Sequence, residues 1–352
     1  MATESPTTAA RAERDTLTPA AVAAWLRTRG YPTYRTAQVL TWVYKRGVNF
    51  SEMSNLPRTL RDELAAHFTL PMLKPVRVVC AADDTRKLLF QLDARAAVEA
   101  VLIPDPPRLT LCISSQAGCG MGCGFCATAR LGLLRNLSAA EIVGQVLGAR
   151  ALLRADERIS NIVFMGMGEP LANYAAVVEA IEMLTAEWGV AISARRITVS
   201  TVGLVPQMER LVRNTQVNLA VSLTATTDAQ RARLIPISRR YTLAAVLAVC
   251  RALPIPQRRR ITFEYVMLAG INDADDDAVR LVRLLHGIRA KVNLIPFNPF
   301  PGAVFAAPSP GVIRHFRDRL LAHGVHATVR ESRGRDIQAA CGQLALAERV
   351  VA

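Results

Sequence analysis

Short apolar runs alternate with amphipathic segments from about residue 115 to residue 330, and this alternation leaves few possible folds. Repeated strand–helix units give parallel strands joined by right-handed crossovers. We therefore expect an α/β fold, either an open sheet or a full or partial barrel, with its chemistry at the carboxyl ends of the strands. The predicted strands are 161–164, 196–200, 217–223, 261–267, 292–295 and 327–330. The predicted helices are 138–153, 173–186, 203–213, 243–252, 274–287 and 309–322.

The first hundred residues follow other patterns. A polar leader, expected to be disordered, precedes three short basic helical patterns, and Thr18 with Pro19 is a typical start for the first helix. The small helical domain is interpreted as a stabilising cap or as an RNA-contacting appendage. Short strand-like runs follow it and predict a β linker region. The predicted parts are the leader 1–16, the helical domain 17–72, the β region 73–104, the core 105–336 and a C-terminal segment 337–352.

Composition restricts the class of protein. Apolar residues make up 51% of the 352 residues, which is enough for a large core. The 43 Lys and Arg exceed the 29 Asp and Glu by 14 charges, which indicates a polyanionic partner such as nucleic acid or an acidic membrane surface. The absence of a long apolar run argues against a membrane span. Three of the seven cysteines fall within eight positions, which indicates metal chemistry in a reducing compartment. We therefore expect a cytoplasmic, basic, metal-binding protein.

A cysteine cluster carries the strongest chemical signal. Cys119, Cys123 and Cys126 form a C-x3-C-x2-C loop, and the glycines between them let the backbone curl around a metal centre. A structural zinc site would need a fourth ligand, and no nearby His or Cys supplies it. A [4Fe–4S] cluster held by three cysteines instead leaves one iron open to a substrate.

Glycine and polar residues follow several predicted strands. Gly166-Met-Gly168-Glu169-Pro170 comes after the strand at 161–164, and its glycines allow close approach of the backbone to a ligand. Ser200, Ser222 and Asn298 stand where later strands end. Taken singly, each is more often a turn or capping residue, but together they predict a cofactor site at this edge.

The motifs resemble the radical S-adenosylmethionine (SAM) superfamily and, within it, the RNA adenosine methyltransferases of the RlmN/Cfr group. The resemblance covers residues 18 to about 345 and implies a partial (β/α)6 radical SAM barrel with a small helical N-terminal domain and a short β extension. It also implies a [4Fe–4S] cluster on the three loop cysteines and a bound SAM. The motifs are CISSQAGC at 112–119, GMGEPLAN at 166–173, LIPI at 234–237, NLIPFNPFPGA at 293–303 and GRDIQAACGQL at 334–344. The implied SAM-binding residues are Gly168, Glu169, Ser200, Ser222, Leu223, Thr224 and Asn298.

The resemblance further implies an activity. Members of the RlmN type methylate C2 of an adenosine in 23S rRNA and of the tRNA adenosine beside the anticodon, whereas the Cfr type methylates C8. Ala117, Pro170 and the segment 296–302 resemble the C2 branch. The C8 enzyme and a non-catalytic RNA-binding iron–sulfur protein are the alternatives. The implied partners are 23S rRNA, tRNA and an external electron donor, for a cytoplasmic protein that we expect to be a monomer.

Three further residues receive roles only through the resemblance. Cys341 would be methylated by one SAM and would carry the methyl carbon to C2, Glu99 would accept the C2 proton, and Cys112 would resolve the adduct through a transient disulfide with Cys341. The sequence alone would make Glu99 a solvated residue at the exposed phase of a strand. Two positions depart from the family pattern, because Thr224 replaces a usual His and Gln338 replaces a usual Asp. We expect activity to survive both changes.

Overall fold

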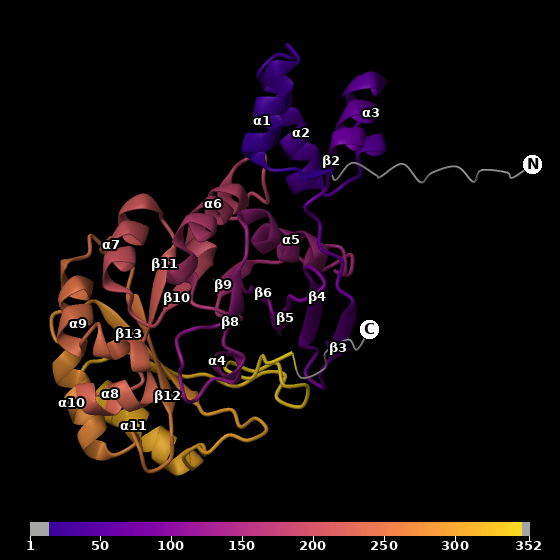
Figure 1. Ribbon diagram of the computed structural model, residues 1–352. Helices are drawn as coiled ribbons and strands as arrows, with labels where there is room; N and C mark the ends of the chain where they lie inside the picture. Colours follow the sequence, from indigo (N-terminus) through magenta and orange to yellow (C-terminus); the bar gives the residue numbers. More distant parts are fainter. Residues whose placement is uncertain (1–13, 347–352) are drawn as a thin grey trace, which may run out of the picture. The chain divides into compact units, whose positions relative to one another are not determined.

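The computed structural model describes residues 14–346, which form two compact units (Figure 1). The N-terminal unit comprises the described residues through Pro71 together with Glu187–Gly189, and the core unit comprises Met72–Ala186 and the chain from Val190 onward. Trp188 belongs to the N-terminal unit because its ring packs edge-on against that of Tyr44, with 5.8 Å between the centroids. The return of three residues to this unit was not predicted from the sequence.

The N-terminal unit is helical, as the sequence predicts. Thr18 caps its first helix by accepting a hydrogen bond from the backbone N–H of Ala21, and Pro19 occupies the first helical position. Its helices are α1 (Pro19–Thr28), α2 (Tyr34–Leu40), which continues as a π-helix (Thr41–Arg46), and α3 (Arg58–His67).

The last two residues of the predicted leader 1–16 belong to the folded N-terminal unit. Asp15–Thr16 form strand β1, which pairs in parallel with β2 (Phe68–Thr69). The adjacent Leu17 is completely buried and donates its backbone N–H to the carbonyl of Thr69, so it fixes this pairing. Residues 1–13 of the predicted leader lie outside the described part of the chain.

The core unit confirms the predicted α/β fold. Its sheet is open, in the order β14-β13-β12-β11-β10-β9-β6-β5-β4-β3, and the strands from β6 to β14 pair in parallel. The parallel strands are β6 (Arg108–Cys112), β9 (Asn161–Phe164), β10 (Ile197–Thr201), β11 (Asn218–Ser222), β12 (Ile261–Met267), β13 (Ala290–Pro296) and β14 (Ala327–Val329). The helices after successive strands are α5 (Ala139–Arg150), α6 (Tyr174–Thr185), α7 (Val205–Asn214), α8 (Asp228–Leu234) with α9 (Leu243–Ala252), α10 (Asp275–Leu285) and α11 (Pro310–Ala322).

The region 73–104, predicted as a short β linker region, extends this sheet. Strand β5 (Ala97–Asp105) pairs antiparallel with β6, from Val101 opposite Cys112 to Asp105 opposite Arg108. Strands β4 (Arg86–Gln91) and β3 (Arg77–Cys80) continue outward from it. The side chains of β4 and β5 are mostly buried, so these strands add to the core of the unit.

Two small elements near the cysteine loop complete the fold. Strand β7 (Gln116–Gly118) pairs antiparallel with β8 (Leu133–Asn136), and the short helix α4 (Ala127–Arg130) lies between them in sequence. Figure 1 shows the yellow C-terminal segment passing beside α4, where the N–H of Ala127 donates to the carbonyl of Gly342. The C-terminal segment therefore contacts the chain directly after the cysteine loop.

Candidate active site

A cavity at the carboxyl ends of the parallel strands brings five cysteines together. Its empty volume is about 1220 Å³, including the part open to solvent. The wall includes all three thiols of the C-x3-C-x2-C loop and two thiols from distant parts of the sequence. These five residues are Cys112, Cys119, Cys123, Cys126 and Cys341. The cavity therefore gathers the cysteines to which the sequence assigned chemistry.

Glycine backbone geometry closes the cysteine loop. Gly118 has φ +76°, and a Cβ built on it would lie 1.9 Å from the carbonyl oxygen of Gly132. This close approach lets the N–H of Cys119 donate to the same oxygen at 2.8 Å. The loop is thus fixed at its start by the turn that leads into β8.

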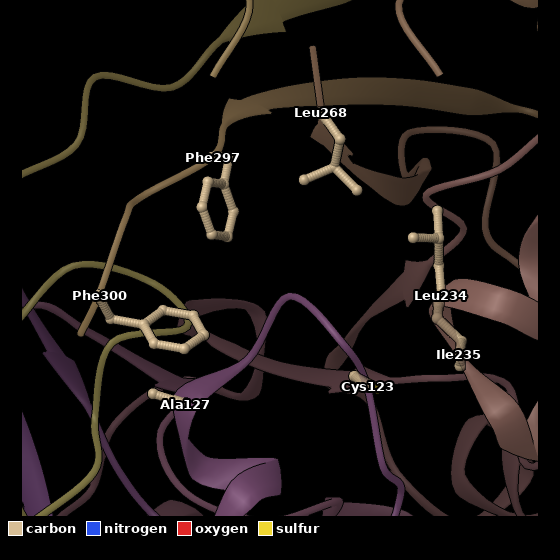
Figure 2. Close-up of a cluster of buried hydrophobic side chains, with 7 residues drawn as sticks. All are labelled: Cys123, Ala127, Leu234, Ile235, Leu268, Phe297 and Phe300. Carbon is tan, nitrogen blue, oxygen red and sulfur yellow. The ribbon is translucent and has the colours of Figure 1, made fainter. Parts of the chain in front are cut away.

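The inner side of the cysteine loop is apolar. Figure 2 shows Cys123 and Ala127 among Leu234, Ile235, Leu268, Phe297 and Phe300, with which they form a buried cluster. Burial raises the pKa of Cys119 to about 11 and the pKa of Cys123 well above its usual value. Thiolates at these positions therefore need a compensating positive charge, which a metal centre provides.

The donor set suits an iron–sulfur cluster. Three soft thiols are typical ligands for iron–sulfur or zinc centres. In residues 14–346, no three His, Cys, Asp or Glu side chains gather closely enough to bind a single ion. The three loop cysteines instead form part of the wall of a larger cavity. A cluster held by three thiolates would leave one iron facing that space.

Glu169 presents a buried carboxylate at the cavity wall. Its Oε1 accepts from the N–H of Leu171 at 3.0 Å and its Oε2 from the N–H of Val202 at 2.9 Å. Burial raises the pKa of Glu169 to about 7, although these hydrogen bonds oppose the shift. The neighbouring Gly168 has φ +99°, and a Cβ there would lie 2.5 Å from the Cβ of Gln116. Only glycine fits at this point, so the loop packs directly against Gln116 of β7.

Most of the predicted SAM-binding residues line the cavity, and two do not. Leu223 and Thr224 are completely buried in the turn after β11, where the N–H of Leu223 donates to the carbonyl of Glu264. Thr224 has φ 55°, an unusual value for a β-branched residue, and its carbonyl accepts from the Asn272 amide at 2.7 Å. The predicted residues on the wall are Gly168, Glu169, Ser200, Ser222 and Asn298.

Cys112 and Cys341 reach the cavity from opposite ends of the core sequence. Cys112 ends β6, and burial raises its pKa to about 12. Burial also raises the pKa of Cys341, and the guanidinium of Arg330 opposes the shift at both thiols. All seven cysteines are free thiols in this structure, so the expected transient disulfide is not formed here.

The C-terminal segment is tied to the elements around the cavity. The amide of Asn298 donates to the carbonyl of Cys341 at 3.1 Å, and the hydroxyl of Thr128 donates to the carbonyl of Leu344 at 2.6 Å. Gln343 donates to the carbonyl of Pro299 at 2.6 Å. These contacts hold Cys341 beside the cysteine loop and the end of β13.

Glu99 is buried, which corrects the expectation of a solvated residue. The sequence VEAVLIP alternates too little to identify the inner face, and β5 is covered on both faces. Glu99 lies on the face that carries Cys112, because Val101 stands directly opposite Cys112 and Glu99 is two residues away on the same strand. Glu99 is not part of the cavity wall in this structure.

Two charged residues on the wall were missed as site residues. Glu264 in β12 is buried, accepts from the Asn293 amide at 2.7 Å, and has its pKa raised by burial. Arg330, which directly follows β14, also lines the cavity. A lone carboxylate inside the apolar strand ITFEYVM was the available signal for Glu264.

Arg231 joins the ends of two neighbouring strands through hydrogen bonds to their carbonyls. This completely buried guanidinium donates to the carbonyls of Val202 at 2.6 Å and of Ser222, Leu223 and Tyr241 at 3.3 Å each. It therefore joins the carboxyl ends of β10 and β11. Burial lowers the pKa of Arg231 to about 10, which leaves it charged at neutral pH.

Replacing Arg231 by methionine is expected to destabilise the core unit. The variant leaves several buried carbonyls without donors, at a cost of about 3 kcal/mol or more. Urea unfolding would measure the change, with Arg233→Met, an exposed position on the same helix, as the control. Equal stability of the two variants would contradict the organising role of Arg231.

Two family models match the chain. The model of the Radical SAM superfamily matches residues 113–282, which include the cysteine loop and Glu169. The model of the Ribosomal RNA large subunit methyltransferase N-terminal domain matches residues 16–70, which fall in the N-terminal unit.

Individual proteins resemble the chain over most of its length. A protein of Anaeromyxobacter dehalogenans named "Dual-specificity RNA methyltransferase RlmN" is 52% identical over 323 residues, 90% of this chain and 87% of its own. A protein of the same name from Syntrophobacter fumaroxidans is 52% identical over 321 residues, 91% of this chain and 94% of its own. The crystal structure of a radical SAM methyltransferase from Sphaerobacter thermophilus has a TM-score of 0.89 at 47% identity, covering 94% of this chain and 99% of that one.

Proposed function

The chain belongs to the RlmN family of radical SAM RNA methyltransferases, and from this premise we propose that it methylates C2 of adenosine in 23S rRNA and in the tRNA position beside the anticodon. It is a SAM-dependent RNA methyltransferase with a radical SAM fold. The observation that carries the proposed transfer through a protein thiol is the presence of Cys112 and Cys341 in one cavity with the three loop cysteines, and the identity to RlmN proteins supports C2 as the target. An enzyme that moves a carbon through a protein thiol needs this arrangement.

The loop cysteines would hold the [4Fe–4S] cluster through Cys119, Cys123 and Cys126. When bound, the cluster supplies the electron that cleaves SAM and so starts the radical chemistry. Glu169 offers a carboxylate to a cationic amino group, and the neighbouring polar side chains offer hydrogen bonds. The proposed SAM-binding residues are Gly168, Glu169, Ser200, Ser222 and Asn298 on the wall, and Leu223 and Thr224 behind it.

The remaining steps belong to residues of this chain. Adenine C2 is an electron-poor carbon and does not attack a methyl donor directly, so Cys341 first accepts the methyl group on its Sγ. One hydrogen atom of the S-methyl group passes to the radical formed from SAM, and the S-bound carbon then bonds to C2. Glu99 accepts the proton that leaves C2, and the odd electron leaves the adduct, for which the proposed cluster would be the acceptor. Cys112, as the thiolate, then attacks the Sγ of Cys341, and the S–C bond breaks with its electron pair on the carbon. A proton completes the methyl group, and the methylated base is released as the two cysteines form a disulfide.

The basic charge supports RNA as the substrate. Net charge is +14, and arginines occur in groups on the core unit. These groups are 239–240, 258–260, and Arg330 with Arg333 and Arg335, and further basic residues lie on the N-terminal helices. Phosphate contacts of this kind position an RNA without reading its bases, and their strength falls with salt.

Further partners and the setting are part of the proposal. An external electron donor would reduce the cluster, and the protein would act as a monomer in the cytoplasm. Among residues 14–346, none of the helices has the length and apolar character required to span a bilayer.

Mass analysis of RNA tests the proposed function. RNA from a strain lacking the gene would be digested and compared after complementation with the wild type or with Cys341→Ala. The wild type should restore 2-methyladenosine in 23S rRNA and tRNA, and Cys341→Ala should restore none. Finding 8-methyladenosine would instead show the C8 enzyme, and finding no methylated adenosine with active SAM cleavage would contradict the proposed substrate.

A further inference from the structure

A buried ion pair joins Lys87 to Glu99, the proposed proton acceptor. The Nζ of Lys87 is 3.3 Å from the Oε1 of Glu99, and the two side chains are only 9% and 4% exposed. Lys87, Val101 and Cys112 stand opposite one another on β4, β5 and β6, so their side chains share one face. The pair therefore belongs to the same face as the resolving thiol.

Burying the lysine ammonium at this position costs desolvation free energy. The neighbouring positions 88–90 of β4 are occupied by apolar side chains, all of them buried. A buried ammonium is tolerated when a carboxylate compensates its charge, and a buried pair of this kind is weak evidence for stability by itself. A hydrophobic residue would serve packing equally well, so the lysine points to a function of its charge.

The two oxygens of Glu99 have different partners. Oε1 faces Lys87, whereas Oε2 accepts from the N–H of Ala345 at 3.0 Å and from the N–H of Leu346 at 3.2 Å. Ala345 and Leu346 follow Cys341 on the C-terminal segment, while Lys87 is fixed within the sheet. Lys87 is thus the partner that stays in place if the segment carrying Cys341 shifts during the reaction.

We propose that Lys87 is a positioning residue that holds the carboxylate of Glu99 in the orientation in which it accepts the C2 proton. The inference rests on the proposed function, because it assigns the proton acceptor to Glu99. In the adduct the C2–H bond breaks, its electron pair stays with the ring, and the proton passes to the carboxylate, while the odd electron left by the radical addition passes to the proposed cluster. Without the ammonium, Oε1 of Glu99 would lose the partner within the sheet that fixes its direction.

The test separates proton removal from the earlier steps. Lys87→Met keeps the length of the side chain and removes its charge, Lys87→Arg keeps the charge, and Lys87→Gln keeps a donor without charge. Reconstituted enzymes would be assayed for 5′-deoxyadenosine, for S-methylation of Cys341, for the covalent protein–RNA adduct and for 2-methyladenosine. We expect Met and Gln to lower product formation about 100-fold, the usual size of a general-base contribution, and to accumulate adduct. Arg should restore product to within about tenfold.

The double variant Lys87→Met/Glu99→Gln adds a control for folding. It removes both charges, so no uncompensated charge remains buried, and it should be as defective as either single variant because the two residues act as a unit. Product at the wild-type rate in Lys87→Met and Lys87→Gln would overturn the proposal. Equal loss of Cys341 methylation and product would overturn it as well, because the defect would then be structural. If the wild type itself forms no 2-methyladenosine, the proposed function fails instead.

Discussion

The Cys112→Ala variant is expected to stop with its RNA substrate covalently attached to the protein. Cys112 lines the cavity with Cys341, and in the proposed sequence it alone breaks the bond between the Cys341 sulfur and the methyl carbon. The earlier steps use Cys341, Glu99 and the loop cysteines, which the substitution leaves intact. Denaturing electrophoresis with labelled RNA would show a band at the summed mass, with turnover reduced at least about 1000-fold, as for loss of a nucleophile.

Two variants control this experiment. Cys250→Ala removes another buried thiol, on α9 and outside the cavity wall, and should form product with no persistent adduct. Cys112→Ala/Cys341→Ala should form no adduct, because the attacking carbon has no thiol to carry it. Free methylated RNA from Cys112→Ala at the wild-type rate would show that another group resolves the adduct.

The fold of the core unit could be predicted because its strands and helices repeat a simple pattern. The expected strand at 261–267 is β12, and the expected helix at 243–252 is α9. Buried parallel strands are nearly continuous apolar runs, and such runs are easy to locate in a sequence. The hairpin of β7 and β8 with the short helix α4 was not predicted, because elements of three or four residues carry too little periodicity.

The parts of the candidate site that depend on residue type could be predicted from the sequence. The parts that depend on which face of a strand is buried could not. Spacing identifies the three loop thiols, the family resemblance adds Cys112 and Cys341, and the ends of strands identify Ser200 and Ser222. The burial of Glu99 and its pairing with Lys87 depend on which face of β5 is turned inward and on the register with β4. Arg231 was missed for a similar reason, since four backbone carbonyls from separate segments meet it only in the folded chain.

Replacing Cys123 by alanine is expected to remove the cluster and all activity while leaving the fold intact. Cys123 is buried against Leu234 and Phe297, so an alanine fits the same apolar surroundings at small cost. The two remaining thiols cannot hold a cluster that needs three cysteine ligands. Protein prepared without oxygen should therefore contain little iron or sulfide, form no detectable 5′-deoxyadenosine and methylate no RNA.

Metal content and stability must be measured together for this variant. Cys250→Ala again gives the matched control, because it deletes a buried thiol and should keep the iron, the sulfide and the activity. The unfolding midpoint of metal-free Cys123→Ala should lie close to that of the metal-free wild type, since only the missing ligand separates them. A wild type that retains zinc alone, or a Cys123→Ala variant that still cleaves SAM, would remove the iron–sulfur chemistry on which the assignment of Cys119, Cys123 and Cys126 depends.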